Sequence, residues 1–214
     1  MKKLITDEEF FATYDPTEYR NPAVAVDVVM VDREMRVCLK QRMKPPQHLK
    51  MGLPGAFMDE GEYAPETAVR AVHRGVPEID SRLIDPILLG VFGRKGRDIR
   101  TRVMSISYLV PVCSLQEDWF PMDLAVHQGL AFDHYEICLA AKNFIHSHIY
   151  DPTVVRLFLP TTFSLSDYRK LVEVVTESTL DPSNFRKNVE LTRRIVRPAA
   201  PAKRGKPSPY AFSI

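Results

Sequence analysis

The chain has 214 residues, of which 45% are hydrophobic and 26% are charged, and its formal net charge is +2. These values are typical of a globular protein with one large domain or two small ones, and they exclude fibrous and wholly disordered chains. No apolar stretch approaches the roughly 18 residues that cross a bilayer, and the first residues turn acidic before a signal-peptide core could form. We therefore expect a cytoplasmic protein.

The cysteine and histidine positions give no indication of a metal site. Cys38, Cys113 and Cys138 lie far apart and form no CxxC pair, so neither a disulfide framework nor a zinc site is expected. His146 and His148 are two positions apart on a predicted helix, and such residues do not share a face. We therefore expect the three thiols to be reduced and buried, and we expect no bound metal.

The first part of the chain is predicted to form a mixed sheet with flanking helices. After a polar leader, β-branched residues at 23–31 predict a strand that is covered on both faces, and a second strand is predicted at 36–42. Prolines and glycines between 45 and 61 predict a loop. The next expected elements are a helix, two strands and a long helix, at 65–76, 87–92, 103–110 and 134–148.

The long helix is expected to begin at a capping residue and to bury one side. Asp133 is the predicted N-cap, because a short acidic side chain accepts a hydrogen bond from the first turn. Helical spacing places Ile137, Ala141, Phe144 and Ile145 on the inward face.

The second part is predicted to be a winged helix-turn-helix. Asp151-Pro152 interrupts the pattern, and we place a domain boundary there, between residues 1–150 and 151–214. Helices are expected at 153–159, at 165–176 after a capping-box-like start, and from 182 onward. A strand at 194–197, a basic loop and a final strand with alternating Tyr210, Phe212 and Ile214 follow. The predicted fold class is therefore α+β.

The small net charge is the sum of two opposite charges. Residues 1–150 hold 18 basic and 21 acidic side chains, whereas residues 151–214 hold 11 basic and 6 acidic ones. The first part therefore has a net charge of −3 and the second a net charge of +5. A basic stripe of this kind is typical of a protein that binds a polyanion, although a solvated surface can have the same composition.

The last predicted helix and the hairpin carry the side chains that read DNA. The last helix of a helix-turn-helix enters the major groove, where Asn pairs with adenine and Arg or Lys with guanine. A basic wing can lie on the backbone or in the minor groove. The alternative is a winged domain that binds another protein. The predicted DNA-binding residues are Asn184, Arg186, Lys187, Asn188, Arg193, Arg194, Lys203, Arg204 and Lys206.

Residues 53–62 followed by 65–78 resemble the Nudix box. That pattern is Gly, five residues, Glu, seven residues, then Arg-Glu-hydrophobic-any-Glu-Glu-any-Gly-hydrophobic, and Glu62 and Arg70 stand at its spacing. The other positions depart from it: Ala56 replaces the leading Gly, Ala71 the Glu after the Arg, Arg74 and Gly75 the paired Glu, and Pro77 the closing Gly.

These departures affect the residues that define the catalytic family. In Nudix hydrolases the glutamate cluster binds the divalent metals that activate water and offset the charge of a diphosphate. Ala, Gly and a cationic Arg in place of three carboxylates predict a domain that binds a ligand without catalysing hydrolysis. No metal and no cofactor are expected to be required.

Several cations remain that could bind phosphate groups. Arg42 follows the second strand, and Arg97, Arg100 and Arg102 lie in a basic segment at 94–102, so they could act as bidentate donors. A solvated hairpin loop or an interdomain salt-bridge patch is the alternative. The predicted effector-binding residues are Arg42, Glu62, Arg70, Arg97, Arg100 and Arg102.

The two halves together resemble the Nudix-related transcriptional regulators of the NrtR type, in which a degenerate Nudix domain precedes a winged helix. Besides the box, the resemblance rests on the segments 96–102, 130–134, 159–165, 184–187 and 205–210. Between Val112 and Trp119 the chain is short for the strand-loop-strand of that family.

The resemblance implies a homodimeric repressor that binds a palindromic operator on double-stranded DNA near genes of NAD metabolism. Its implied effector is ADP-ribose or a related NAD-derived nucleotide. Some relatives are tied to the use of sugars such as arabinose, which is one alternative. A second alternative is a Nudix pyrophosphatase that acts on ADP-ribose-like substrates and carries an accessory winged domain.

Overall fold

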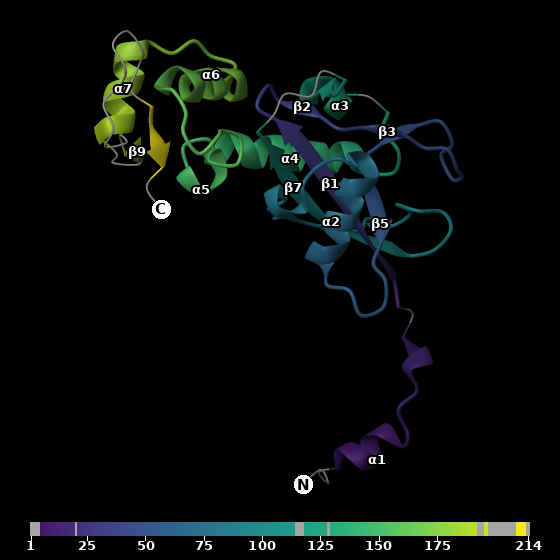
Figure 1. Cartoon of the computed structure of the whole chain (residues 1–214). Helices are drawn as coiled ribbons and strands as arrows, with labels where there is room; N and C mark the ends of the chain where they lie inside the picture. Colours follow the sequence, from purple (N-terminus) through teal and green to yellow (C-terminus); the bar gives the residue numbers. More distant parts are fainter. Residues whose placement is uncertain are drawn as a thin grey trace.

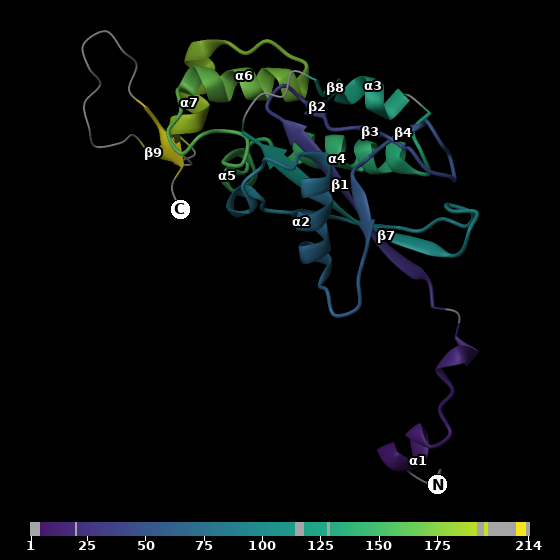
Figure 2. The ribbon, with the colours of Figure 1, turned by 45° about the vertical axis from the view of Figure 1, so that its right-hand side comes forward.

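The structure is a computed structural model, and it describes residues 5–19, 21–113, 118–127, 129–191, 195–196 and 209–212. It contains an N-terminal segment, a body built on a sheet, and a helical C-terminal part (Figure 1). The N-terminal segment carries α1 (Asp7–Phe11) and the 3-10 helix η1 (Pro16–Glu18), and it extends away from the body in both views (Figure 2). The polar leader predicted no helix; Thr6 and Glu9 form a capping box that starts α1.

The body is organised around two long parallel strands. β1 (Ala23–Asp32) and β7 (Val103–Val112) pair over ten residues, from Ala23 opposite Val103 to Asp32 opposite Val112. The sheet order is β6-β7-β1-β2-β8, and β5 also pairs with β1. Its shorter strands are β2 (Arg36–Val37), β5 (Gly55–Phe57), β6 (Ile87–Phe92) and β8 (Phe120–Pro121).

The expected mixed sheet is confirmed, but the second strand is not continuous. The prediction of one strand at 36–42 was wrong: β2 ends at Val37, and β3 (Lys40–Gln41) pairs with β4 (Met51–Gly52) in a separate two-stranded sheet. The segment predicted as a loop therefore contains β4 and β5. Strands of two or three residues carry too little periodicity to be recognised in sequence, because their partners elsewhere in the chain determine them.

Helices cover both faces of the sheet. Along β1, Val26, Val28 and Met30 pack with α2 (Ala64–Gly75), whereas Val29 and Val31 belong to the core that contains α4 (His134–His148). This alternation explains why β1 is apolar on both sides. A short helix, α3 (Met122–His127), lies beside α4.

The long helix α4 has the predicted bounds, and its inward face is confirmed at Ile137, Ala141 and Ile145, while Phe144 is only partly buried. Asp133 is the N-cap residue, as predicted, and its backbone carbonyl accepts from the first turn. Its side chain makes no capping hydrogen bond: Oδ1 accepts from Arg97, and Oδ2 is buried without a partner among the described residues.

The C-terminal part has three helices and a hairpin, as predicted. α5 (Pro152–Val155) is shorter than the expected helix at 153–159, since the chain continues in tight turns. α6 (Leu165–Thr176) begins at the Ser164–Asp167 capping box, and α7 (Pro182–Leu191) follows it. β9 (Ile195–Val196) and β10 (Ala211–Phe212) are antiparallel. Ile214 lies outside the described residues.

One buried core joins the C-terminal helices to α4. Ile145 of α4 and Ile149, which caps its C-terminus, cluster with Val155, Tyr168 and Phe185 from α5, α6 and α7. The Tyr168 hydroxyl also donates a hydrogen bond to the carbonyl of Ile149 at 3.3 Å. The C-terminal helices therefore pack directly on the end of α4. Within the described residues, no helix is both long and apolar enough to span a membrane.

Candidate functional site

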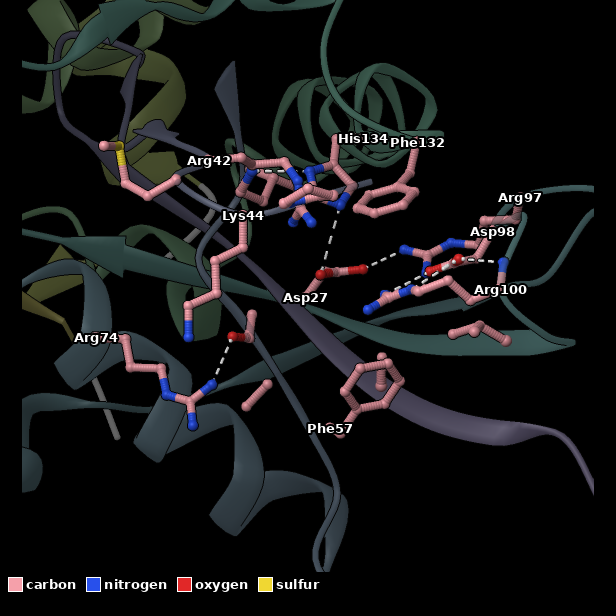
Figure 3. A pocket seen from close by; sticks show the side chains of 17 residues that line it. Asp27, Arg42, Lys44, Phe57, Arg74, Arg97, Asp98, Arg100, Phe132 and His134 are labelled. Atoms are coloured by element: carbon pink, nitrogen blue, oxygen red, sulfur yellow. Dashed lines mark hydrogen bonds and ion pairs between the residues drawn. The ribbon is translucent and has the colours of Figure 1, made fainter. Parts of the chain in front are cut away.

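A cavity of about 650 Å³ opens where β1, the loop after β3, α2 and the start of α4 meet. Figure 3 shows the side chains that line it. Five of them are cationic, two are carboxylates and two are aromatic: Arg42, Lys44, Arg74, Arg97 and Arg100; Asp27 and Asp98; Phe57 and Phe132. The cavity therefore has an excess of three positive charges and two ring faces, which suits an anionic aromatic ligand.

A buried ion-pair network fixes the inner wall. The side chain of Arg97 is only 4% exposed. Its guanidinium pairs with Asp27 and, through Nε, with Asp133 Oδ1 at 2.6 Å. Asp27 also accepts a hydrogen bond from the Ser105 hydroxyl at 2.7 Å. Arg97 thus links β1 to the start of α4, and its charge is balanced by two buried carboxylates.

His134 lies beside this network in its neutral form. The backbone N–H of Leu53 donates to Nδ1 of His134 at 2.8 Å, so the ring proton is on Nε2, which faces Asp27 Oδ1 at 3.6 Å. Complete burial lowers the pKa of His134, because the charged ring would lose its hydration. At neutral pH the ring therefore contributes a donor and no charge.

Arg42 and Phe132 form a stacked pair at the mouth of the cavity. The Arg42 guanidinium lies 4.6 Å from the ring centre of Phe132, and its Nε donates to the carbonyl of Pro46 at 3.2 Å. Phe132 has a left-handed backbone with φ of 54°, and its N–H donates to Oε1 of Gln47 at 2.9 Å. Such a backbone is uncommon for a bulky side chain and is typically maintained at functional sites.

Arg100 lies at the other end of the cavity. It pairs with Asp98 at 2.7 Å, and this hydrogen-bonded partner lowers the pKa of the Asp98 carboxyl. The same guanidinium is 5.7 Å from the ring centre of Phe57, whose side chain is 45% exposed. A flat ring from a ligand could therefore contact Phe57 without displacing a core residue.

Three of the predicted effector residues lie elsewhere. Glu62 pairs with Arg70 at 2.6 Å, and this hydrogen bond is the largest cause that lowers the pKa of Glu62 to about 2. Arg102 donates to the carbonyl of Arg94 at 3.1 Å. Glu62, Arg70 and Arg102 do not line the cavity, whereas Arg42, Arg97 and Arg100 do. The effector-binding role of all six stays a prediction.

The residues present do not fit the divalent metals of a Nudix hydrolase. Ala71 is fully buried, and a Cβ on Gly75 would lie 2.5 Å from Met30 Cε and 2.8 Å from Pro54 Cγ, so no side chain can occupy that position without a shift in the packing. Arg74 directs a cation toward the cavity. In the described part of the chain, no three His, Cys, Asp or Glu residues cluster in a way that could hold a metal ion.

The predicted recognition helix presents polar side chains to solvent. Asn184, Arg186, Lys187 and Asn188 of α7 are exposed, whereas Phe185 and Val189 are both 5% exposed. Phe185 packs on Tyr168 of α6 with ring centres 5.3 Å apart. The helix thus packs by one face, and within the described residues these four side chains of its other face are exposed. Arg193, Arg194, Lys203, Arg204 and Lys206 lie outside the described residues.

Comparisons with known proteins agree with this arrangement. No family model matches the chain. It is 23% identical over 200 residues to the ADPR responsive transcriptional repressor NtrR of Acinetobacter baylyi, covering 86% of this chain and 78% of that protein. Over 131 residues it is 31% identical to the ADP-ribose pyrophosphatase of Methanocaldococcus jannaschii, covering 56% of this chain and 72% of the relative.

Two solved structures of Shewanella oneidensis NrtR extend the likeness. The one in complex with a 27mer DNA has a TM-score of 0.71 at 23% identity, over 89% of this chain and 93% of that one, and it shows the fold. The NUDIX domain in complex with ADP ribose is 27% identical with a TM-score of 0.53, over 66% of this chain and 99% of that domain. The chain belongs to the NrtR-type family of Nudix-related regulators. Its α+β fold, a Nudix sheet followed by a winged helix, is the fold of NrtR.

Sequence reasoning did not assign several residues to this NrtR-type site. Lys44 belongs to no recognisable motif, Phe57 lies within the Nudix-like segment without a role in its pattern, and Asp98 lies within the basic segment 94–102. Phe132 and His134 were present in the segment 130–134 that resembles the family, and Arg74 was noted as a departure from the box. Those two signals could have indicated the site.

Proposed function

We propose that this NrtR-type chain is a DNA-binding transcriptional repressor that responds to ADP-ribose or a related NAD-derived nucleotide. The observation that carries the proposal is the cavity of about 650 Å³, with an excess of positive charge and the exposed ring of Phe57 in its lining. Its volume lies within the range of ligand sites, about 300–1,000 Å³. ADP-ribose has a diphosphate that cations bind and an adenine that a ring can stack on.

The same site is unsuited to hydrolysis. A Nudix pyrophosphatase needs several carboxylates to hold its metals, and Glu62 is already engaged by Arg70 and by the Thr67 hydroxyl, which donates to it at 2.7 Å. We therefore propose that the domain binds its effector without cleaving it and requires no metal. The likeness to an archaeal ADP-ribose pyrophosphatase makes turnover the alternative that an assay must test.

DNA binding is assigned to the C-terminal part, residues 151–214. The exposed side chains Asn184, Arg186, Lys187 and Asn188 are of the types that contact bases and phosphates in the major groove. The basic residues that follow α7 in the sequence add positive charge, which favours binding to DNA phosphates. We propose a homodimer on a palindromic operator, since two recognition helices about 34 Å apart match one turn of DNA.

The helix α4 is the proposed connection between the two partners. Its N-terminal end carries Asp133 and His134, which contact Arg97 and Leu53 at the cavity. Its C-terminal end packs on the winged helix. An effector that binds one position of α4 better than the other would change the distance between the recognition helices, and the DNA affinity would change accordingly.

The test is to measure binding of the full chain to a labelled duplex from upstream of its own gene, with and without ADP-ribose. Substituting Arg186 and Lys187 together by Ala should lower duplex affinity at least about tenfold and flatten its salt dependence. Arg82→Ala is the matched control, because Arg82 is an exposed arginine paired locally with Asp80. Full affinity in the double variant would contradict the assignment of α7. Turnover of ADP-ribose that vanishes in Glu62→Gln would establish the hydrolase alternative.

A further inference from the structure

The inner end of α2 carries a cation where the Nudix box has a metal-binding carboxylate. Arg74 occupies the last turn of α2, lines the cavity and donates through Nη1 to the carbonyl of Gly55 at 3.2 Å. This bond uses one of the five N–H donors of the guanidinium, so the others remain available to a ligand. In Figure 3 the side chain extends toward the same space as Lys44.

Arg74 is a cation without a carboxylate partner in the part of the chain that the structure describes. Among the described residues neither Arg74 nor Lys44 has an acidic partner, in contrast to Arg97 and Arg100, which pair with Asp27 and Asp98. A cation that faces a cavity without a counterion attracts an anion, and a guanidinium binds the oxygens of a phosphate in bidentate geometry.

The residues around Arg74 do not suit a divalent metal ion. Position 71 is a buried Ala, a Cβ at position 75 would require Met30 and Pro54 to shift, and Glu62 is paired with Arg70. A divalent cation would therefore approach Arg74 without the carboxylates that normally hold it, and two like charges would repel each other. The residues here do not fit the metal, but they do fit the diphosphate that the metal would neutralise.

We propose that Arg74, assisted by Lys44, takes the place of the divalent cation, so that a nucleotide diphosphate binds this cavity without metal. The guanidinium is part of the chain, so the affinity of the regulator for its ligand does not vary with the Mg²⁺ concentration. This inference rests on the proposed function, because it names the chemistry by which the effector is held.

The test is calorimetric titration of the full chain with ADP-ribose, once in EDTA and once in millimolar Mg²⁺. The wild-type affinity is expected to agree within about twofold between the two media. Arg74→Ala should weaken binding at least about tenfold in both, as expected for the loss of a charged hydrogen bond, and Arg74→Lys should recover part of the loss. Lys44→Ala should give a smaller loss, and Arg82→Ala none.

The titrations distinguish a failure of this inference from a failure of the proposed function. If wild-type binding needs Mg²⁺, or if Arg74→Ala and Lys44→Ala both bind as the wild type does, the inference is overturned while the proposed function stands. If the wild type binds ADP-ribose in neither medium, the proposed function fails with it. Circular dichroism of each variant shows whether the fold is retained, and the comparison of wild type in the two media is decisive even if a variant does not fold.

Discussion

Removing the positive charge at the centre of the buried network should destabilise the whole protein. Arg97→Met leaves the carboxylates of Asp27 and Asp133 without the cation that they share, and their side chains are only 9% and 1% exposed. Breaking a buried pair in this way typically costs about 3–5 kcal/mol, because an uncompensated charge remains in a poorly solvated place. At about 2–4 °C per kcal/mol for a chain of this size, Tm should fall by about 6–20 °C.

Urea unfolding followed by fluorescence, together with calorimetric Tm, measures this loss. Arg82→Met is the matched control: its ion pair with Asp80 is on the surface, and it should leave the midpoint unchanged. Adding Asp27→Asn to Arg97→Met should recover part of the lost stability, since one of the two stranded charges is then absent. A loss below about 1 kcal/mol in Arg97→Met would refute the reasoning, because the network would then contribute no more than a surface pair.

Three further substitutions test neighbouring parts of the structure. The lowered pKa of His134 means that the unfolded chain binds a proton more readily than the folded one, so the free energy of unfolding should fall as the pH drops below about 6.5. His134→Phe should remove this pH dependence in urea titrations at several pH values. The same substitution leaves the Leu53 N–H without its acceptor and should cost about 1–3 kcal/mol of stability. Gly55→Ala places a Cβ onto the carboxylate of Asp27 and should weaken ADP-ribose binding in calorimetry; unchanged affinity would show that the cavity floor adapts. Phe185→Ala should cost about 3–5 kcal/mol in thermal unfolding, because the ring is buried between α6 and α7, and a loss near zero would indicate that α7 is not packed as described.

Much of the fold could be predicted from the sequence because its long elements are strongly periodic. The run in β1, the apolar faces of α4 and α6, and the Ser164–Asp167 capping box are local signals that persist in the folded chain. The short strands β3 and β4 could not be predicted, since they exist only by pairing with each other. The side chain of Asp133 illustrates the same limit: its position as the N-cap could be predicted, but its hydrogen bond from Arg97, 36 positions away, could not.

The candidate site was less predictable than the fold, for a related reason. Arg42, Arg97 and Arg100 were identified as cations near predicted strand ends, and the structure brings them to one cavity. The spacing of Glu62 and Arg70 matches the Nudix box, yet the two side chains neutralise each other outside the cavity. A motif gives the positions of residues along a helix, whereas the direction of each side chain depends on partners that only the tertiary structure supplies.

The central claim is that one chain binds operator DNA and that ADP-ribose controls this binding. Fluorescence anisotropy of a labelled duplex, carrying the inverted repeat upstream of the gene, tests it most directly. In EDTA, the full chain should bind this duplex with an affinity that falls steeply with salt, and saturating ADP-ribose should shift the affinity by about 5–150-fold, the usual range of allosteric coupling. A DNA affinity that does not respond to ADP-ribose, while calorimetry shows the nucleotide bound, would contradict the account.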